Sequence, residues 1–435
     1  DRRGHTGLWM PALLGGIGYI SHVTIDGFDT GVYARDRKIM YVLEHITLRN
    51  QREAGIVSHS KPLTIRKLTS DNAVPAVVNS TETGQIVLLD SVLRNEAATG
   101  AAIENHGLLF ARNVEVQGYA QAIDDRGTPV DAGHVDEYVS HDVLTLGDNV
   151  PKRSLNLPIR DTPSIETEPR EKWKAVDGDD QEDDTAAIQK AIDSGAQTVY
   201  LTGDLTVSDT IVLRGNLRHL IGDAPGGIGG PRGIRARAET LGRTKPVLRI
   251  ETGPHELTVI ENIAAHTAWL YQNDSNKTVV IRNSEAGPYR NSGTGDVFFE
   301  SAGGGYGTGA YEMVRFPYVV VTRQNAWFRD YNPEGAFPHL VNDGGNVVVL
   351  GAKFGEWHGP YVRNVNGGQT EILGGYFNSI SQDRNPYRAW GVNDNSRMAV
   401  VVVDDQQEAH TPHALAVRHF DRGQASAIPY EQATQ

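Results

Sequence analysis

Cysteine is absent from the 435 residues, so the sequence excludes disulfides, thiolate metal sites and a cysteine nucleophile. A basic surplus is absent too, because the formal net charge is −13, and no electrostatic footprint for nucleic acid is visible. The longest apolar runs, such as residues 398–403, are far shorter than the roughly 20 residues of a membrane-spanning helix. No secretory leader is visible in the sequence, whose repeated segments begin soon after residues 1–4. We expect a truncated or processed chain that begins inside a domain, with no nucleic-acid or membrane partner.

Glycine, by contrast, is plentiful at 47 residues, which is typical of a chain with many tight turns. A short segment recurs in the first part of the chain, for example as residues 22–28 (HVTIDGF) and 45–51 (HITLRNQ). Each copy alternates apolar and polar residues, as a strand with one buried face requires. The second residues of the five copies follow at spacings of 23, 22, 24 and 22: Val23, Ile46, Leu68, Val92 and Val114. This period predicts the coils of a parallel β-helix, with like positions about 4.8 Å apart.

Asparagine recurs between these strands, at Asn50, Asn72, Asn95 and Asn105. Asparagine tolerates left-handed backbone at sharp corners. We therefore expect these residues to stack from coil to coil.

Periodicity stops at residue 128 and resumes at residue 176. The stretch between them contains five prolines and is too long for an ordinary loop. We predict a partial first β-helix domain at residues 1–127, an extended connector at 128–175 that lies against both domains, a second β-helix domain at 176–405 and a C-terminal tail at 406–435. The predicted fold class is all-β, with two tandem right-handed parallel β-helix domains, the first incomplete.

Acidic residues at 177–184 precede an amphipathic run at 186–194. Aspartates suit a helix N-terminus, and a short helix would cover the open end of the second β-helix. Calcium binding by these acids stays an alternative, although the spacing of an EF-hand loop is absent. In the tail, His410, His413 and His419 are expected to be solvated, with metal binding as the alternative.

The stretch from residue 325 to residue 377 repeats itself three times. Glu334 and Glu356 occupy like places in two copies, 22 residues apart, and Gly351 precedes Gly374 by 23 residues. Since one coil needs about this many residues, we predict that the two glutamates lie nearly above one another. Their predicted neighbours are Trp327, Arg329, Lys353, Trp357 and His358. Two neighbouring carboxylates are the groups that glycoside hydrolysis uses.

These segments resemble a known group of proteins. Residues 178–192 (GDDQEDDTAAIQKAI) are similar to the opening of pectate-lyase-3-type β-helix domains. Four later segments resemble the C-terminal domain of twin-β-helix proteins, which include the glycoside hydrolase family 55 exo-β-1,3-glucanases: 332–335 (NPEG), 342–345 (NDGG), 350–356 (LGAKFGE) and 367–375 (GGQTEILGG). Residues 45–56, 68–79 and 154–163 resemble the first domain and connector of that group. The resemblance covers nearly the whole chain, but the Asp-Asp-Thr cap that normally opens the first domain is missing.

The resemblance implies inverting hydrolysis of a polysaccharide, most simply a β-glucan, with Glu356 as general acid and Glu334 as the second carboxylate. It also implies that polar residues of the first domain position the water, for which Gln51 and Ser70 are the candidates. Apolar neighbours of Glu356, such as Phe354, would raise its pKa by desolvation, as a proton donor requires. The expected sugar-binding residues are Trp327, Arg329, Lys353, Trp357, His358, Glu371 and Tyr376.

Other interpretations stay open. A polysaccharide lyase would use a basic residue such as Lys353, His358 or Arg363 as base on a uronate. A non-catalytic glycan-binding or adhesion module would bind without turnover. Glu334 and Glu356 could also be surface loop residues, and the aromatic residues could pack within the coils.

No cofactor and no metal ion is expected. The expected partner is a polysaccharide or oligosaccharide, and the expected state is a monomer. A secreted or periplasmic location follows from the substrate class.

Overall fold

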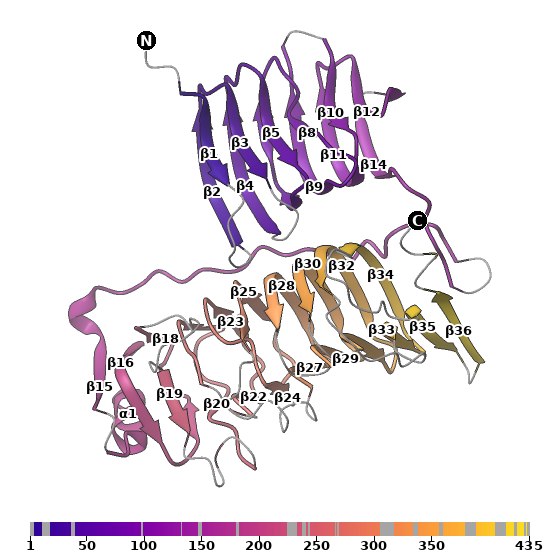
Figure 1. Cartoon of the computed structure of the whole chain (residues 1–435). Helices are drawn as coiled ribbons and strands as arrows, with labels where there is room; N and C mark the ends of the chain where they lie inside the picture. The colour runs from indigo at the N-terminus through magenta and orange to yellow at the C-terminus, as the bar shows by residue number, and fades with distance from the viewer. Residues whose placement is uncertain are drawn as a thin grey trace.

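The structure is a computed structural model in which parallel strands stack coil upon coil (Figure 1). It confirms the predicted all-β fold and its β-helix architecture. Each of the four main sheets takes its strands from only one side of residues 140–173. The structure describes all residues except 1–3, 11–17, 36–39, 97–98, 132, 147–149, 180–181, 224–232, 237–240, 242–243, 266, 268, 305–316, 334–337, 356–359, 379–388, 405–414, 422–423, 430–431 and 433–435.

The strands before residue 140 form the first stack, which has two sheets. One sheet has the order β1 (Thr6–Met10), β3 (Thr30–Arg35), β5 (Ala54–His59), β8 (Val77–Asn79), β10 (Ala101–Asn105), β12 (Gln121–Asp125) and β13 (Thr128–Val130). The other has the order β14 (His134–Val139), β11 (Leu108–Gln117), β9 (Gln85–Arg94), β6 (Pro62–Arg66), β4 (Tyr41–Arg49) and β2 (Gly18–Asp26), with β7 (Thr69–Asp71) beside β4 and β9. The strands are parallel except β13 and β14, which turn back antiparallel and close this end of the stack.

The strands after residue 173 form the second stack, also with two sheets. One has the order β15 (Lys174–Asp179), β16 (Thr198–Val207), β18 (His219–Gly222), β21 (Leu257–Glu261), β23 (Thr278–Arg282), β25 (Val297–Glu300), β28 (Asn325–Pro333), β30 (Asn346–Gly355), β32 (Gln369–Asn378) and β34 (Arg397–Asp404). Beside it, β19 (Gly233–Ala236) pairs with β16, and β26 (Gly303–Gly304) pairs with β28. The other has the order β17 (Ile211–Leu213), β20 (Leu248–Ile250), β22 (Tyr271–Asn273), β24 (Tyr289–Asn291), β27 (Val319–Thr322), β29 (Leu340–Asp343), β31 (Val362–Val365), β33 (Ala389–Asp394), β35 (Leu415–Asp421) and β36 (Gln424–Pro429).

The register of the first stack follows the predicted repeats with one correction. In β9 it is Ser91, and not Val92, that pairs with Val114. The Ser91 side chain is buried, because its Oγ donates to the Leu89 carbonyl at 2.7 Å and accepts from the Leu68 N–H at 3.1 Å. Ser91 can occupy a core position because backbone groups pair its hydroxyl. An alignment that matches only apolar residues therefore places this segment one residue too late in register.

The coil offset in the second stack also varies. Leu350 pairs with Leu373, an offset of 23 that agrees with the spacing from Gly351 to Gly374. Arg329 pairs with Leu350, an offset of only 21. Glu334 and Glu356 lie outside the described residues, so their predicted contact stays a prediction.

The predicted capping helix is present as α1 (Thr185–Asp193). Ile188 and Ile192 are buried and join the core of the second stack, so the helix covers the end of that stack with its apolar face. The N-cap residue, Asp184, makes no side-chain capping hydrogen bond, and instead the Asp183 Oδ1 accepts the Thr185 N–H at 3.0 Å.

The segments at the predicted boundaries differ from the prediction. Residues 128–130 and 134–139 are strands of the first stack, and β15 already belongs to the second, so the connector runs from 140 to 173. It contains one short 3₁₀ helix, η1 (Arg170–Lys172). It lies along both stacks (Figure 1).

Part of the C-terminal tail is structured rather than solvated. In its described residues, β35 pairs in parallel with β33, and β36 turns back antiparallel on β35. The ring of His419 is part of this packing, since its Nδ1 lies 2.8 Å from the Asn393 Nδ2. His410 and His413 lie outside the described residues.

Candidate functional site

The two stacks pack against each other along a seam, which contains connector residues 154–161 (Figure 1). Its side chains point outward from their own coils, while the alternate side chains fill the coil interiors. The apolar part of the seam consists of Met40, Val42, Val87, Leu89, Phe110, Leu157, Val259, Val280, Phe298, Trp327, Val348, Leu350, Leu373 and Tyr376. Along these residues the stacks are in direct contact, so the seam is packed like a protein core.

One buried ion-pair network crosses the seam at Glu44. Its carboxylate accepts hydrogen bonds from the Arg329 Nε, from the Arg66 Nη1 at 2.9 Å and from the Tyr19 hydroxyl at 2.9 Å. Burial would raise the pKa of Glu44, but the two guanidinium groups outweigh it and lower the pKa. Glu44 is therefore an anion that ties the stacks together and is unsuited to donate a proton at neutral pH.

A second network crosses the seam at Glu371, whose side chain is 0% exposed. The Arg112 Nη1 donates to both carboxylate oxygens, at 3.0 and 3.2 Å. The backbone N–H groups of Asn156 and Leu157 donate to them at 2.8 and 3.1 Å. Glu371 therefore joins three segments: the first stack, the connector and the second stack.

Four of the predicted sugar-binding residues lie in this seam: Trp327, Arg329, Glu371 and Tyr376. All four are buried, and none is more than 5% exposed. The Trp327 Nε1 donates to the Pro158 carbonyl at 2.9 Å, and its ring stacks on Phe298 at 4.7 Å. The structure thus gives these residues packing contacts instead of the open cleft that was expected, because the first stack and the connector cover their outward face.

The two candidates for positioning water, Gln51 and Ser70, are buried within the first stack. The Gln51 N–H donates to the Asn72 Oδ1 at 2.7 Å, and the Asn72 Nδ2 donates to the Ser70 Oγ at 2.8 Å. Their polar groups serve the corner of a coil, and the structure does not bring them to a surface.

The remaining predicted residues lie at or beyond the end of β30. Lys353 is half-buried and pairs in register with Tyr376. Glu334, Glu356, Trp357 and His358 lie outside the described residues.

Asp330 is a buried carboxyl that the sequence patterns did not single out. It lies at a bend of β28, with φ +58°, and is 3% exposed. The Ser301 Oγ donates to its Oδ2 at 3.1 Å, while its Oδ1 has no hydrogen-bond partner in the described part of the chain. Burial raises the pKa of Asp330 to about 7, which the hydrogen bond from Ser301 only partly offsets. A carboxyl with this pKa can be protonated or ionised near neutral pH.

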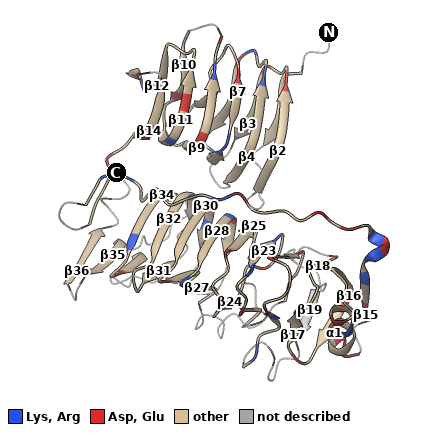
Figure 2. Ribbon diagram, turned by 180° about the vertical axis from the view of Figure 1, so that it is seen from behind, with Lys and Arg blue, Asp and Glu red and all other residues tan. Residues whose placement is uncertain are grey.

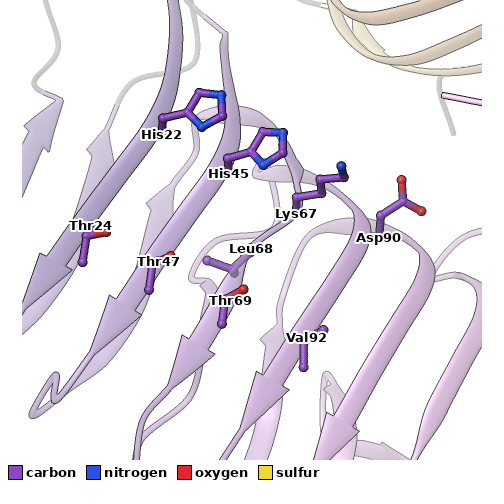
Figure 3. A pocket seen from close by; sticks show the side chains of 9 residues that line it. All are labelled: His22, Thr24, His45, Thr47, Lys67, Leu68, Thr69, Asp90 and Val92. Carbon is purple, nitrogen blue, oxygen red and sulfur yellow. The ribbon is translucent and has the colours of Figure 1, made fainter. Parts of the chain in front are cut away.

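A shallow groove lies on the outer face of the first stack (Figure 3). One column of side chains lies at the bend of the long strands and consists of His22, His45, Lys67 and Asp90. A second column lies beside it and consists of Thr24, Thr47, Thr69 and Val92. The rings of the first two residues, His22 and His45, stack with their centroids 4.4 Å apart.

The rim of the groove is formed by the connector. The Asp161 carboxylate lies 2.5 Å from the Lys67 Nζ and 3.4 Å from the His45 Nε2. On the next coil, Asp90 accepts a hydrogen bond from the Arg66 Nε at 2.9 Å. The sequence contains a signal for this groove, because His22, His45 and Lys67 are the first residues of three repeated segments. The fourth segment was predicted to begin at Ser91, one residue after Asp90, so the pattern missed Asp90.

Comparison of the sequence with known proteins finds no matching family model and no matching curated protein. Among the described residues, no helix is long and apolar enough to cross a membrane. In the same part of the chain, no group of three histidine or acidic side chains is placed to hold a metal ion. Figure 2 shows basic and acidic residues interspersed over the strands of both stacks.

Proposed function

We propose that the protein is a secreted glycoside hydrolase that acts on a polysaccharide, most simply a β-glucan. One observation supports the proposal most. β28 and β30 are hydrogen-bonded parallel neighbours that end at Pro333 and Gly355. Glu334 and Glu356 are the next residues of the chain. Each of two adjacent strands of one sheet is therefore followed directly in the sequence by a glutamate.

In the proposed reaction, the protonated Glu356 carboxyl gives its proton to the leaving glycosidic oxygen. The Glu334 carboxylate accepts a proton from water, whose oxygen then attacks the anomeric carbon from the opposite face. The two carboxyl groups of an inverting enzyme lie about 6.5–9.5 Å apart, whereas neighbouring strands lie about 4.8 Å apart. The two side chains must therefore diverge from their strands.

The seam supports the same proposal because it holds both strands in place. Arg329 ties β28 to Glu44, and Leu350 of β30 is part of the apolar seam. A reaction site is held more precisely by rigid strands than by mobile loops. In this proposal Trp327, Arg329, Glu371 and Tyr376 do not touch sugar. They pack in the seam and hold the strands that precede the two glutamates.

The experiment measures reducing ends released from a soluble β-1,3-glucan, a β-1,4-glucan and polygalacturonate. We expect turnover of a neutral β-glucan. Glu356→Gln should lower kcat by about 10²–10⁴, because an amide cannot give up the proton. Glu82→Gln, at an exposed position between β8 and β9, is the matched control and should leave kcat unchanged.

Other outcomes would decide against the proposal. Full activity of the Glu356→Gln variant would remove Glu356 from the mechanism. An ultraviolet-absorbing unsaturated product from polygalacturonate would indicate a lyase, which eliminates instead of adding water. Binding of glucan without any turnover by the wild-type protein would indicate a glycan-binding module.

A further inference from the structure

We propose that the groove beside His45 binds an uncharged polysaccharide chain that lies along the axis of the first stack, at a place separate from Glu334 and Glu356. The inference goes beyond the proposed hydrolase, because it concerns a second surface with its own residues. It depends on the chemistry of the lining, the backbone at the bend, the charge balance and the position of the groove.

The threonine column offers free hydroxyl groups at a regular interval. Thr24 pairs in register with Thr47, and Thr47 pairs with Thr69 (Figure 3). Their hydroxyls make no hydrogen bond within the described part of the chain. Adjacent coils place them about 4.8 Å apart. A polymer that carries hydroxyl groups on every sugar can meet one donor and acceptor pair on each coil.

The column of His22, His45 and Lys67 has a left-handed backbone conformation that is unfavourable for residues other than glycine. His22, His45 and Lys67 have φ values of +58°, +54° and +55°. Left-handed backbone costs a residue other than glycine free energy, and glycine is the residue that avoids this cost. In the second stack, the bends of β30 and β32 carry Gly351 and Gly374, whereas the bend of β28 carries Asp330 at φ +58°. Glycine is thus an available alternative at such a bend, and the first stack instead places two imidazoles and one ammonium group side by side along the groove.

The charges of the groove balance one another. Lys67 is paired with Asp161, and Asp90 is paired with Arg66. Burial lowers the pKa of His45 and outweighs the nearby Asp161 carboxylate, which raises it. The lowered pKa favours the neutral imidazole. A groove without excess charge suits an uncharged polyol better than a uronate or phosphate polymer.

The groove and the ends of β28 and β30 lie on opposite sides of the seam. On β4, Val42 and Glu44 face the seam, and His45 is the bend beyond them. Arg329 of β28 bonds to Glu44, whereas Gly351, the residue after the register partner of Arg329, faces Met40 and Val42. The strands of the second stack therefore run away from His45 toward their ends. Gly355, where β30 ends, follows four residues after Gly351. A chain in the groove therefore does not occupy the place proposed for catalysis.

The test measures binding of a soluble β-1,3-glucan and of polygalacturonate by calorimetry, in the Glu356→Gln background so that the probe stays intact. Thr47→Val and Thr69→Val together remove two hydroxyls and keep the side-chain volume. We expect the association constant for the glucan to fall about tenfold. Thr128→Val, on the exposed strand β13, is the matched control and should bind as the parent does.

Four results would overturn the proposal: no binding of the glucan by the parent, equal binding by the double variant, an equal loss in Thr128→Val, or tighter binding of polygalacturonate. The urea midpoint of the double variant shows whether it is folded. Because groove binding does not need Glu356, a lack of turnover would remove the proposed hydrolase and leave the groove intact. Turnover of short oligosaccharides should be the same with and without the two threonine changes.

Discussion

Asp330 is a single residue whose protonation should change the stability of the whole protein. Its carboxyl is buried, it has one hydrogen-bond donor in Ser301, and burial raises its pKa to about 7 from the usual 3.8. Between these two values the unfolded chain has released the proton while the folded chain still holds it. The free energy of unfolding therefore falls as pH rises through this window, and levels off above it.

Asp330→Asn removes the titration while it keeps the shape of the side chain. We expect the variant to equal the wild-type protein near pH 4 and to exceed it in unfolding free energy by about 2–4 kcal/mol near pH 8. Urea unfolding at several pH values across this range measures the difference. Asp136→Asn, at an exposed position of β14, should show no such trend. Parallel curves for Asp330→Asn and the wild type would contradict the assignment.

At the scale of the strands, side-chain ladders inside the corners hold successive coils in register. The Asn79 Nδ2 donates to the Asn105 Oδ1 at 2.8 Å, and the Asn105 Nδ2 donates to the Asp125 Oδ1 at 2.8 Å. Asn364 and Asn393 form a similar pair in the second stack, at 2.9 Å. Stacking was predicted for Asn105, and the structure confirms it. Its partners were not predicted, because they lie 26 and 20 residues away in the chain and so fall outside the spacing of the repeats.

Asn105→Ala would leave the buried amide of Asn79 and the carboxylate of Asp125 each without one partner. We expect a loss of about 2–4 kcal/mol in unfolding free energy. Asn346→Ala is the matched control, because its Nδ2 makes one side-chain hydrogen bond, 3.0 Å to the Asn325 Oδ1, on the exposed surface. That change should cost less than about 1 kcal/mol. Equal losses, measured by urea unfolding, would show that the ladder adds nothing.

At the scale of the whole molecule, the seam makes the two stacks depend on each other. Its closest approach at a glycine is at Gly374, where a Cβ atom would lie 1.9 Å from the Thr64 Oγ1. The same threonine hydroxyl donates to the Leu373 carbonyl at 3.2 Å. The absence of a side chain at residue 374 is therefore part of the fit between the stacks.

Gly374→Ala and Gly367→Ala form a matched pair for testing the seam. Both glycines have left-handed backbone, at φ +83° and +81°, but nothing lies within 4 Å of a Cβ atom at Gly367. We expect both changes to cost about 1–2 kcal/mol for the backbone. Gly374→Ala should lose about 1–3 kcal/mol more, because it overpacks the seam. Thermal unfolding measures both losses of stability. Equal losses would mean that the seam accommodates the added methyl group at residue 374 without loss of stability.

Much of the coil could be predicted from the sequence, but its outward contacts could not. The spacing from Val23 to Ile46 and the helix after Asp184 are local patterns, and the structure confirms both. The register at Ser91 failed because a buried serine breaks the apolar alternation. The alternation along β28 correctly separates Trp327 from Phe328, yet it cannot tell a covered outward face from an open one.

The sequence by itself determined that this chain winds into β-helical coils, since alternation and turn residues act within one coil and repeat every 22 or 23 residues. Only the tertiary structure decided which outward faces are buried. The partner of Arg329 is Glu44, which lies 285 residues away in the chain. No local sequence pattern can predict this pair, because the contact forms only when the two folded stacks pack against each other.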